Sequence, residues 1–302
     1  ERRGAYLQGR FTPHPGHQLI LGGRYDWHPF FGGSTTLRMG YVGSRKDLTL
    51  KALYGQAVQE PSHRQFFGGW LGSGSSTLLE PERSSTTELA LTWTRPTWSL
   101  TADLYRIHNW NTILPYAGGA ENLGAQYLDA LDLHAHALVR GPGFLELRLW
   151  AALTRLFHHR GAPYTPRINA LESPDVGDIP RTKLWYGLTA LFPRQASLTL
   201  KGRTFSDRRT VGTNPVGRLP GYTVLEAYAQ VRDFPWPGLT MGLRATNLLD
   251  RAYSHPGLRE AEAGETPGSF DANGDWVGSA GFNTSRMPQS GRVLDLILRW
   301  RF

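Results

Sequence analysis

The sequence of 302 residues contains no cysteine, so neither a disulfide framework nor a thiolate metal site can be proposed for it. It also contains no run of 18 apolar residues, which excludes a transmembrane helix. Charged residues make up only 19% of the chain, against about 25% in ordinary soluble domains. No signal peptide is visible, because the first residues, ERRGAYLQGRF, already have the pattern of the middle of a fold. We therefore expect a fragment or a processed form of a longer chain.

Glycine and aromatic residues are abundant, and the chain is basic. It contains 35 glycines and ten tryptophans, and its formal net charge is +8. The glycine content is typical of a protein with many turns. The charge is compatible with nucleic acid, an anionic surface or an anionic ligand, and its value alone does not choose between these partners.

Thirteen segments of about ten residues alternate apolar residues with polar or small ones. In the last of them, GRVLDLILRWRF, one row is wholly apolar and the other carries three charges. Such alternation indicates half-buried strands, and even the best helical candidate, LWAALTRLFHH, also fits a strand. The predicted strands are 4–12, 18–27, 35–42, 48–58, 86–94, 98–109, 125–139, 144–156, 181–191, 195–206, 221–232, 237–248 and 290–302.

The connections between these segments alternate in length. After odd-numbered strands they are short and rich in proline and glycine, as in PHPGH at 13–17 and GPG at 141–143. After even-numbered strands most are long, and the longest spans 249–289. Membrane barrels have tight periplasmic turns and long outer loops, so this alternation predicts that the last strand runs inward to the periplasmic rim.

Segment length favours a membrane barrel over a soluble all-β fold. Strands of soluble proteins average about five or six residues, whereas an outer-membrane strand needs about 9–11. Aromatic residues also gather near segment ends, where barrels carry interfacial girdles. A soluble β-propeller would show a repeat of the length of one blade, and the sequence has none. We predict an all-β, antiparallel transmembrane β-barrel whose leucine-rich rows face lipid and whose charged rows face a wet lumen.

Four stretches resemble the C-terminal barrel of TonB-dependent outer-membrane receptors, in the order and with the spacing of that family. They are LYGQAVQEPSHRQFF, LEPERSSTTELALTW, ATNLLDRAYSHP and MPQSGRVLDLILRWRF. The chain departs from the family at Gln59 to Ser62, where Arg-Ala-Pro is usual, and at Ala90, where glycine is common. The residues that match are Pro81, Glu82, Ser84, Glu88, Asn247, Leu248, Leu249, Asp250, Tyr253, Gly291, Arg292 and Phe302.

The resemblance implies a barrel of 22 strands with an N-terminal plug, in the outer membrane of a Gram-negative bacterium. Residues 1–302 then form a single domain, the last thirteen strands, without the plug. The implied partners are outer-membrane lipid, the barrel-assembly machinery and, only through the missing plug, a TonB-type energy-coupling protein. The implied function is energy-coupled uptake of a bulky scarce nutrient, foremost a ferric siderophore, without a cofactor. We expect this chain alone not to be a working transporter.

Two groups of residues are candidates for ligand contact. Aromatic residues together with arginine are typical of binding surfaces, and the long loops offer such a set; packing of loop on loop is the alternative. The loop candidates are His63, Arg64, Phe66, Phe67, Trp70, Trp110 and Tyr116. The second group is a basic lumen wall that would attract anionic solutes, unless its charges pair with acidic residues of the wall. The wall candidates are Arg24, Arg38, Arg148, Arg203, Arg244 and Arg299. Trp300 and Phe302 are predicted to form a C-terminal assembly signal.

No enzyme site is predicted, and no metal site. His134 and His136 share a face with Asp132, but such residues are also ordinary components of a polar wall. His158 and His159 point in opposite directions on an extended chain. DANGD at 271–275 resembles the start of a calcium loop, but Phe282 stands where a bidentate glutamate is required. Basic residues alternate with leucines instead of forming a patch with stacking aromatics, so nucleic acid is not an expected partner.

Three functions remain open from the residues alone. The first is the receptor barrel for nutrient uptake. The second is a self-contained passive pore of about fourteen strands, and the third, least favoured, is a barrel enzyme. An upstream plug of about 150 residues would support the first, whereas ion conductance of the refolded chain would support the second.

Overall fold

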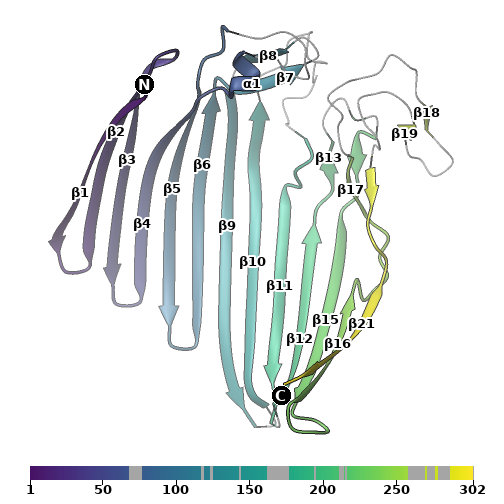
Figure 1. The fold of residues 1–302 in the computed structure, drawn as a ribbon. Coiled ribbons are helices and arrows are strands. Elements are labelled where there is room, and N and C mark those ends of the chain that lie inside the picture. Colours follow the sequence, from purple (N-terminus) through teal and green to yellow (C-terminus); the bar gives the residue numbers. More distant parts are fainter. Residues whose placement is uncertain are drawn as a thin grey trace.

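The computed structural model contains one large antiparallel sheet of thirteen strands (Figure 1). It describes residues 1–67, 77–116, 119–122, 125–142, 144–161, 177–193, 195–210, 214, 216–257, 269–270, 276–277 and 286–301. The sheet order follows the chain, apart from short strands in the long connections. Its strands are β1 Arg3–His14, β2 His17–His28, β3 Gly32–Arg45, β4 Leu48–Gln59, β5 Glu82–Arg95, β6 Trp98–Trp110, β9 Ala125–Gly141, β10 Phe144–Gly161, β11 Thr182–Leu191, β12 Ala196–Phe205, β15 Tyr222–Arg232, β16 Leu239–Thr246 and β21 Val293–Trp300.

All thirteen predicted segments are strands of this sheet, and the helical candidate at 149–159 belongs to β10. The helix found in the described residues is the single turn α1, His63–Phe66. No helix among the described residues is long and apolar enough to cross a membrane. The neighbour-to-neighbour order has a local cause, because each tight turn can only join antiparallel strands that are adjacent.

The alternation in connection length is also present in space. Short turns lie at one end of the sheet, and α1 and the described parts of the long connections lie at the other end (Figure 1). We call these the turn end and the loop end. The short loop strands are β7 Ile113–Tyr116, β8 Gly119–Asn122, β13 Arg208–Arg209, β14 Arg218–Leu219, β17 Ser254–Pro256, β18 Ser269–Phe270, β19 Trp276–Val277 and β20 Arg286–Pro288.

The strand register collects the leucine-rich rows on one face of the sheet. Leu89 pairs with Leu104, and Leu104 pairs with Leu131, so the three side chains point the same way. The same rule places Leu243 beside Leu296. The rows that continue these leucines form what we call the leucine face.

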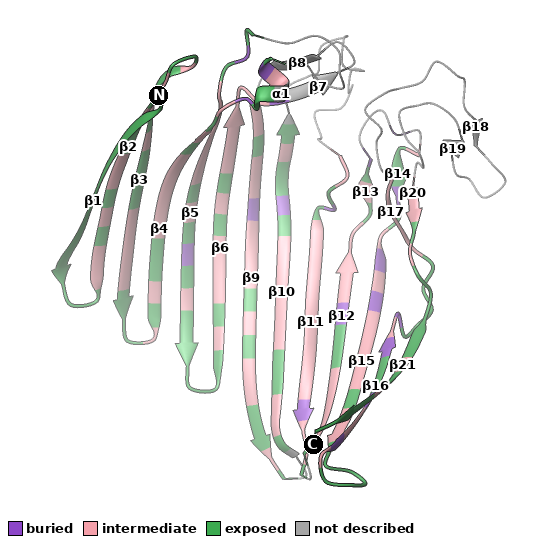
Figure 2. Ribbon diagram, in the orientation of Figure 1, coloured by how far each residue is buried: buried purple, intermediate pink, exposed green. Residues whose placement is uncertain are grey.

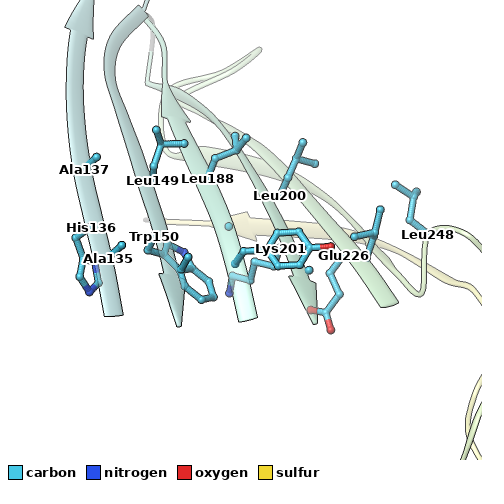
Figure 3. A pocket seen from close by; sticks show the side chains of 15 residues that line it. Ala135, His136, Ala137, Leu149, Trp150, Leu188, Leu200, Lys201, Glu226 and Leu248 are labelled. Atoms are coloured by element: carbon cyan, nitrogen blue, oxygen red, sulfur yellow. The ribbon is translucent and has the colours of Figure 1, made fainter. Parts of the chain in front are cut away.

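The charged rows share the opposite, polar face. In β5 the leucine-face side chain of Leu89 is 50% exposed, whereas Ala90 beside it is buried and faces the polar side. Figure 3 shows the two faces at close range, with Leu149, Leu188 and Leu200 projecting to one side and Trp150 and Glu226 to the other. The apolar side chains are therefore the outward ones, as the predicted lipid contact requires.

Aromatic residues gather at the turn end of the leucine face. Trp93 and Trp98, joined by a tight turn, pack edge to face with ring centroids 5.0 Å apart. Trp236 lies 6.3 Å from Trp300 of the final strand. These pairs have the placement of an interfacial girdle, where an indole has an apolar body in lipid and a polar tip in water.

Two of the sequence motifs hold the end of β16 against the start of β21. Asn247 is buried, and its side-chain amide donates to the carbonyl oxygens of Arg251 and Ser290 at 2.9 and 3.1 Å. The Asp250 carboxylate accepts the backbone N–H of Arg292 at 2.8 Å. A Cβ on Gly291 would lie 2.8 Å from that carboxylate, so a larger residue would push the carboxylate away from the Arg292 N–H. The motif therefore serves the backbone of the strand pair.

The sheet is open between β1 and β21 in the part of the chain that the structure describes, because its strand order begins with one and ends with the other. Strand β1 is exposed along its whole length (Figure 2). Because β1 and β21 are the first and the thirteenth strands of an antiparallel sheet, they run in the same direction. Unpaired edge groups cannot be left in hydrocarbon, so each edge requires a further strand in a membrane.

We predict that an arginine substitution destabilises the leucine face more than the polar face. Leu100→Arg places a guanidinium on the leucine face and should lower the free energy of unfolding by up to about 2–4 kcal/mol. Thr101→Arg places the guanidinium beside Asp103 on the polar face. It should lower the free energy of unfolding by about 1 kcal/mol, because the hydrogen bond between the hydroxyls of Thr101 and Thr92 is lost. Urea unfolding of the chain refolded into phosphatidylcholine vesicles measures both; equal losses would contradict the assignment of the faces.

Candidate functional site

Three of the predicted loop residues lie together at the loop end. Helix α1 begins at Ser62, whose hydroxyl accepts the backbone N–H of Gln65, while the Gln65 side chain accepts the N–H of Ser62. This capping box fixes the turn that carries His63, Phe66 and Phe67. Phe66 is only 8% exposed and packs on Leu79 and Ile113. The alternative of loop packing therefore holds for Phe66.

The turn between β2 and β3 completes this aromatic cluster. His28 stacks on Phe31 at 4.8 Å, and Phe31 meets the edge of Phe66 at 5.1 Å. Phe30 packs edge to face on Phe67 at 5.5 Å, and these two rings are 63% and 51% exposed. Sequence reasoning recognised the connection at 28–34 as brief and selected no ligand candidate from it.

The remaining loop candidates do not join this cluster. Trp110 ends β6 in the row of Leu104, so it lies on the leucine face next to His108, 5.0 Å away. The side chains of Arg64 and Tyr116 are not among those described. Trp70, Phe302 and the loop at 271–275 lie outside the described residues.

The six arginines of the predicted wall all lie on the polar face. Arg24 and Asp26 form an ion pair with a shortest distance of 2.5 Å, and Arg148 pairs with Glu146. Others have no ion pair within the described part of the chain; these are Arg38, Arg244 and Arg299. Some charge of the wall is therefore compensated by neighbouring carboxylates, and the rest has no ion-pair partner among the described residues.

His134 and His136 also lie on the polar face, as predicted, in the same strand row as Asp132. His134 pairs across the sheet with Thr101 and Ala152, and His136 pairs with Trp150. No group of three metal-binding side chains occurs among the described residues. His158 lies on the leucine face instead, 3.2 Å from Asp129.

An arginine–aromatic cluster that the sequence did not single out lies at the loop end of β12 and β15. The ring of Tyr222 is 4.3 Å from that of Tyr253, and its hydroxyl is 3.0 Å from Nε2 of His255. Arg203 donates from Nη2 to the Tyr253 hydroxyl at 2.9 Å, and Arg208 lies over the Tyr222 ring at 5.9 Å. We call these five residues the arginine–tyrosine cluster.

The register explains why these five side chains meet. Arg203 pairs across the sheet with Trp185 on one side and with Val224 on the other, on the polar face. Two residues further along β12, Phe205 pairs with Tyr222, so Arg203 and Tyr222 lie on the same face in adjacent rows. Tyr253 reaches them from the connection after β16, which Asn247 fixes in place. Arg203 was predicted as wall and Tyr253 as a motif residue, but their contact depends on a connection whose path the sequence does not show.

The cluster is electropositive, because it contains two arginines. The Arg203 Nε atom is buried and has no hydrogen-bond partner among the described residues. Burial lowers the pKa of His255, and the positive charges of Arg208 and Arg203 lower it further. His255 is therefore uncharged at neutral pH, and its Nε2 can accept the hydrogen bond from the Tyr222 hydroxyl.

A second basic recess lies beside the cluster, with a cavity volume of about 410 Å³. It is lined by Arg155, Arg181, Arg208, Arg209 and Arg218 among others. The guanidinium of Arg218 pairs with the carboxylate of Asp207 there. Arg208 belongs to both features, so the loop end of β10 to β15 concentrates positive charge beside the buried ring of Tyr222 and the half-buried ring of Tyr253.

Comparison with solved structures shows the same fold in outer-membrane receptors. The ferric-catecholate import receptor Fiu from E. coli K12 has a TM-score of 0.71 at 15% identity, over 100% of this chain and 44% of that one. A mutant of the ferric enterobactin receptor PfeA from Pseudomonas aeruginosa has a TM-score of 0.69 at 16% identity, covering 100% and 45%. The FrpB iron transporter from Neisseria meningitidis has a TM-score of 0.68 at 14% identity, covering 100% and 44%.

The chain spans less than half the length of these receptors. No curated protein matches its sequence significantly. A family model described as the β-barrel of TonB-dependent receptor-like proteins matches residues 1–248. That match covers most of the thirteen-stranded sheet, and the chain therefore belongs to the TonB-dependent receptor β-barrel family.

Proposed function

We propose that this protein contributes the barrel wall of an outer-membrane receptor for energy-coupled uptake of a bulky, scarce nutrient, a ferric siderophore. The observation that carries the proposal is the arginine–tyrosine cluster on the polar face of a barrel of this family. Ferric complexes of catecholate siderophores are anionic and aromatic, and arginine with tyrosine suits both properties. Structural neighbours described as iron or ferric-catecholate receptors support the same class of ligand.

The charges of the wall support an anionic ligand. Arg38, Arg244 and Arg299 lack ion-pair partners in the described part of the chain, and a lumen lined by such groups concentrates anions. The aromatic cluster of Phe30 and Phe67 offers a second exposed surface at the same end of the sheet. Energy coupling would act through a plug domain and a TonB-type protein, and insertion would use the barrel-assembly machinery.

The alternative of a passive pore also has a structural argument. Since β1 and β21 run in the same direction, one additional strand would complete an antiparallel barrel of about fourteen strands. No described feature favours an enzyme, and the family and the structural neighbours are receptors and transporters.

Ligand titration and conductance of the refolded full chain separate these functions. The chain, with its ten tryptophans, is refolded into vesicles and titrated with ferric enterobactin while its fluorescence is recorded. The proposal predicts saturable quenching that iron-free enterobactin reproduces only weakly. Steady single-channel conductance without any saturable quenching would overturn it in favour of the pore.

Arg203→Gln should weaken the binding of ferric enterobactin about tenfold or more. The substitution removes the charge-assisted hydrogen bond that Arg203 would donate to the anionic ligand, worth about 1.5–3 kcal/mol. A loss of about 1.4 kcal/mol corresponds to a tenfold weaker affinity. Arg106→Gln on the leucine face is the matched control, since it removes the same charge away from the cluster. Equal weakening in the two variants would show that net charge, and not the cluster, attracts the ligand.

The stability of the chain should rise with pH as His255 loses its proton. Its folded pKa lies below the ordinary value of about 6.5, so the unfolded chain binds more protons in the interval between the two. The contribution of uncharged His255 to the free energy of unfolding is therefore fully present above about pH 6.5. It is lost as the pH falls towards and through the folded pKa. His255→Gln should flatten this part of the profile in urea unfolding; an unchanged profile would assign the dependence to another group.

A further inference from the structure

The leucine face changes character abruptly towards the loop end. Along β6 the outward row reads Leu100, Ala102 and Leu104, and then Arg106. Along β10 the row of Leu153 continues with Arg155. Since Arg155 pairs with Thr182 and Leu131, whose side chains belong to the leucine face, it belongs to the same row, at the rim where it also lines the basic recess.

A bulge in β10 keeps the next basic residues on the same surface. The pairing shifts by one residue between Leu156 and His158, so His158 pairs with Asp129 and Arg160 pairs with Tyr127. Asp129 also pairs with Arg106, which belongs to the leucine-face row. Without the bulge, His158 and Arg160 would point to the polar face. We call Arg83, Arg106, His108, Arg155, His158 and Arg160 the basic belt.

Aromatic rings lie among the cations of the belt. The ring of His108 stacks on Tyr127 with centroids 4.2 Å apart and planes 9° from parallel. Trp110 packs against His108 at 5.0 Å. Tyrosine and tryptophan at this position mark the boundary between hydrocarbon and headgroups, so the belt lies at the depth of the headgroups.

The charge of the belt is positive even after its internal pairing. Asp129 is its one carboxylate among the described outward residues of β5, β6, β9 and β10, and it accepts two hydrogen bonds from Arg106 at 2.6 and 3.0 Å. Arg155 donates one N–H of its guanidinium to the Thr182 hydroxyl, so its other N–H groups can bind a further acceptor. Long arginine stems can lie along apolar surface while their charged ends reach the headgroups.

We propose that the basic belt binds the phosphate groups of anionic lipid headgroups in the membrane leaflet at the loop end. The proposal rests on the proposed location of this barrel in a membrane. Two observations support it. The belt continues the leucine face towards the loop end, and its positive charge is opposite to that of anionic lipid headgroups. Basic residues close to an anionic lipid surface each strengthen association by a factor of about five.

Quenching by brominated lipids measures this preference on the full chain. The chain is refolded into phosphatidylcholine vesicles that contain either dibrominated phosphatidylglycerol or dibrominated phosphatidylcholine. Quenching of tryptophan, Trp110 in particular, reports which lipid occupies the surface. We expect a preference for phosphatidylglycerol that falls at least about fivefold in the variant Arg106→Gln, Arg155→Gln, Arg160→Gln.

A matched triple variant on the other face is the control. Arg38→Gln, Arg244→Gln, Arg299→Gln removes the same charge from the polar face and should leave the preference unchanged. Arg160→Gln, a single change near the end of β10, gives a smaller decrease of the same sign if the triple variant does not refold.

The outcomes separate the two proposals. Equal affinity for the two lipids, or an equal decrease in both triple variants, overturns the basic belt while leaving membrane insertion intact. Displacement of phosphatidylglycerol by inorganic phosphate at millimolar concentration also overturns it, because the belt would then bind phosphate without its lipid. The absence of quenching by either lipid overturns the membrane location itself, and with it the proposed function.

Discussion

The structure depends on one constraint, the pairing of backbone groups between strands in a fixed register. Because side chains alternate along a strand, a register slip of one residue would move leucines to the polar face and arginines into lipid. The pairings of Leu89 with Leu104 and of Arg244 with Asp295 show that neighbouring strands agree on which side is apolar. The polar wall and the leucine face are therefore two results of the same hydrogen-bond ladder.

The sequence was sufficient for the strands and for their faces, because both follow from a local period of two. The thirteen segments, the order of the sheet, and the polar placement of Arg203 and Arg244 all follow from that period and from short turns. Contacts between connections were out of reach, since Phe30 meets Phe67 and Arg203 meets Tyr253 across 37 and 50 residues of chain. Periodicity carries no information about the path of a long loop.

Some residues that the sequence suggested as ligand contacts have a different environment in the structure. Trp110 was expected to face a ligand, but its row places it on the leucine face beside His108. Phe66 was expected to be available for contact, but the capping box of α1 directs it onto Leu79 and Ile113. The alternation of side chains along β6 was enough to assign Trp110 to the face of Leu104, six residues away. The burial of Phe66 could be found only from the structure.

The common direction of β1 and β21 restricts how this sheet can assemble. Two copies inserted in the same orientation and joined edge to edge would place β21 of one protomer beside β1 of its partner as parallel neighbours, whereas the sheet is antiparallel throughout. A homodimeric ring would thus need a different hydrogen-bond pattern at both seams. Only an odd number of added strands keeps the antiparallel pattern around the whole circumference, so a partner that contributes an even number would have to accept one parallel seam.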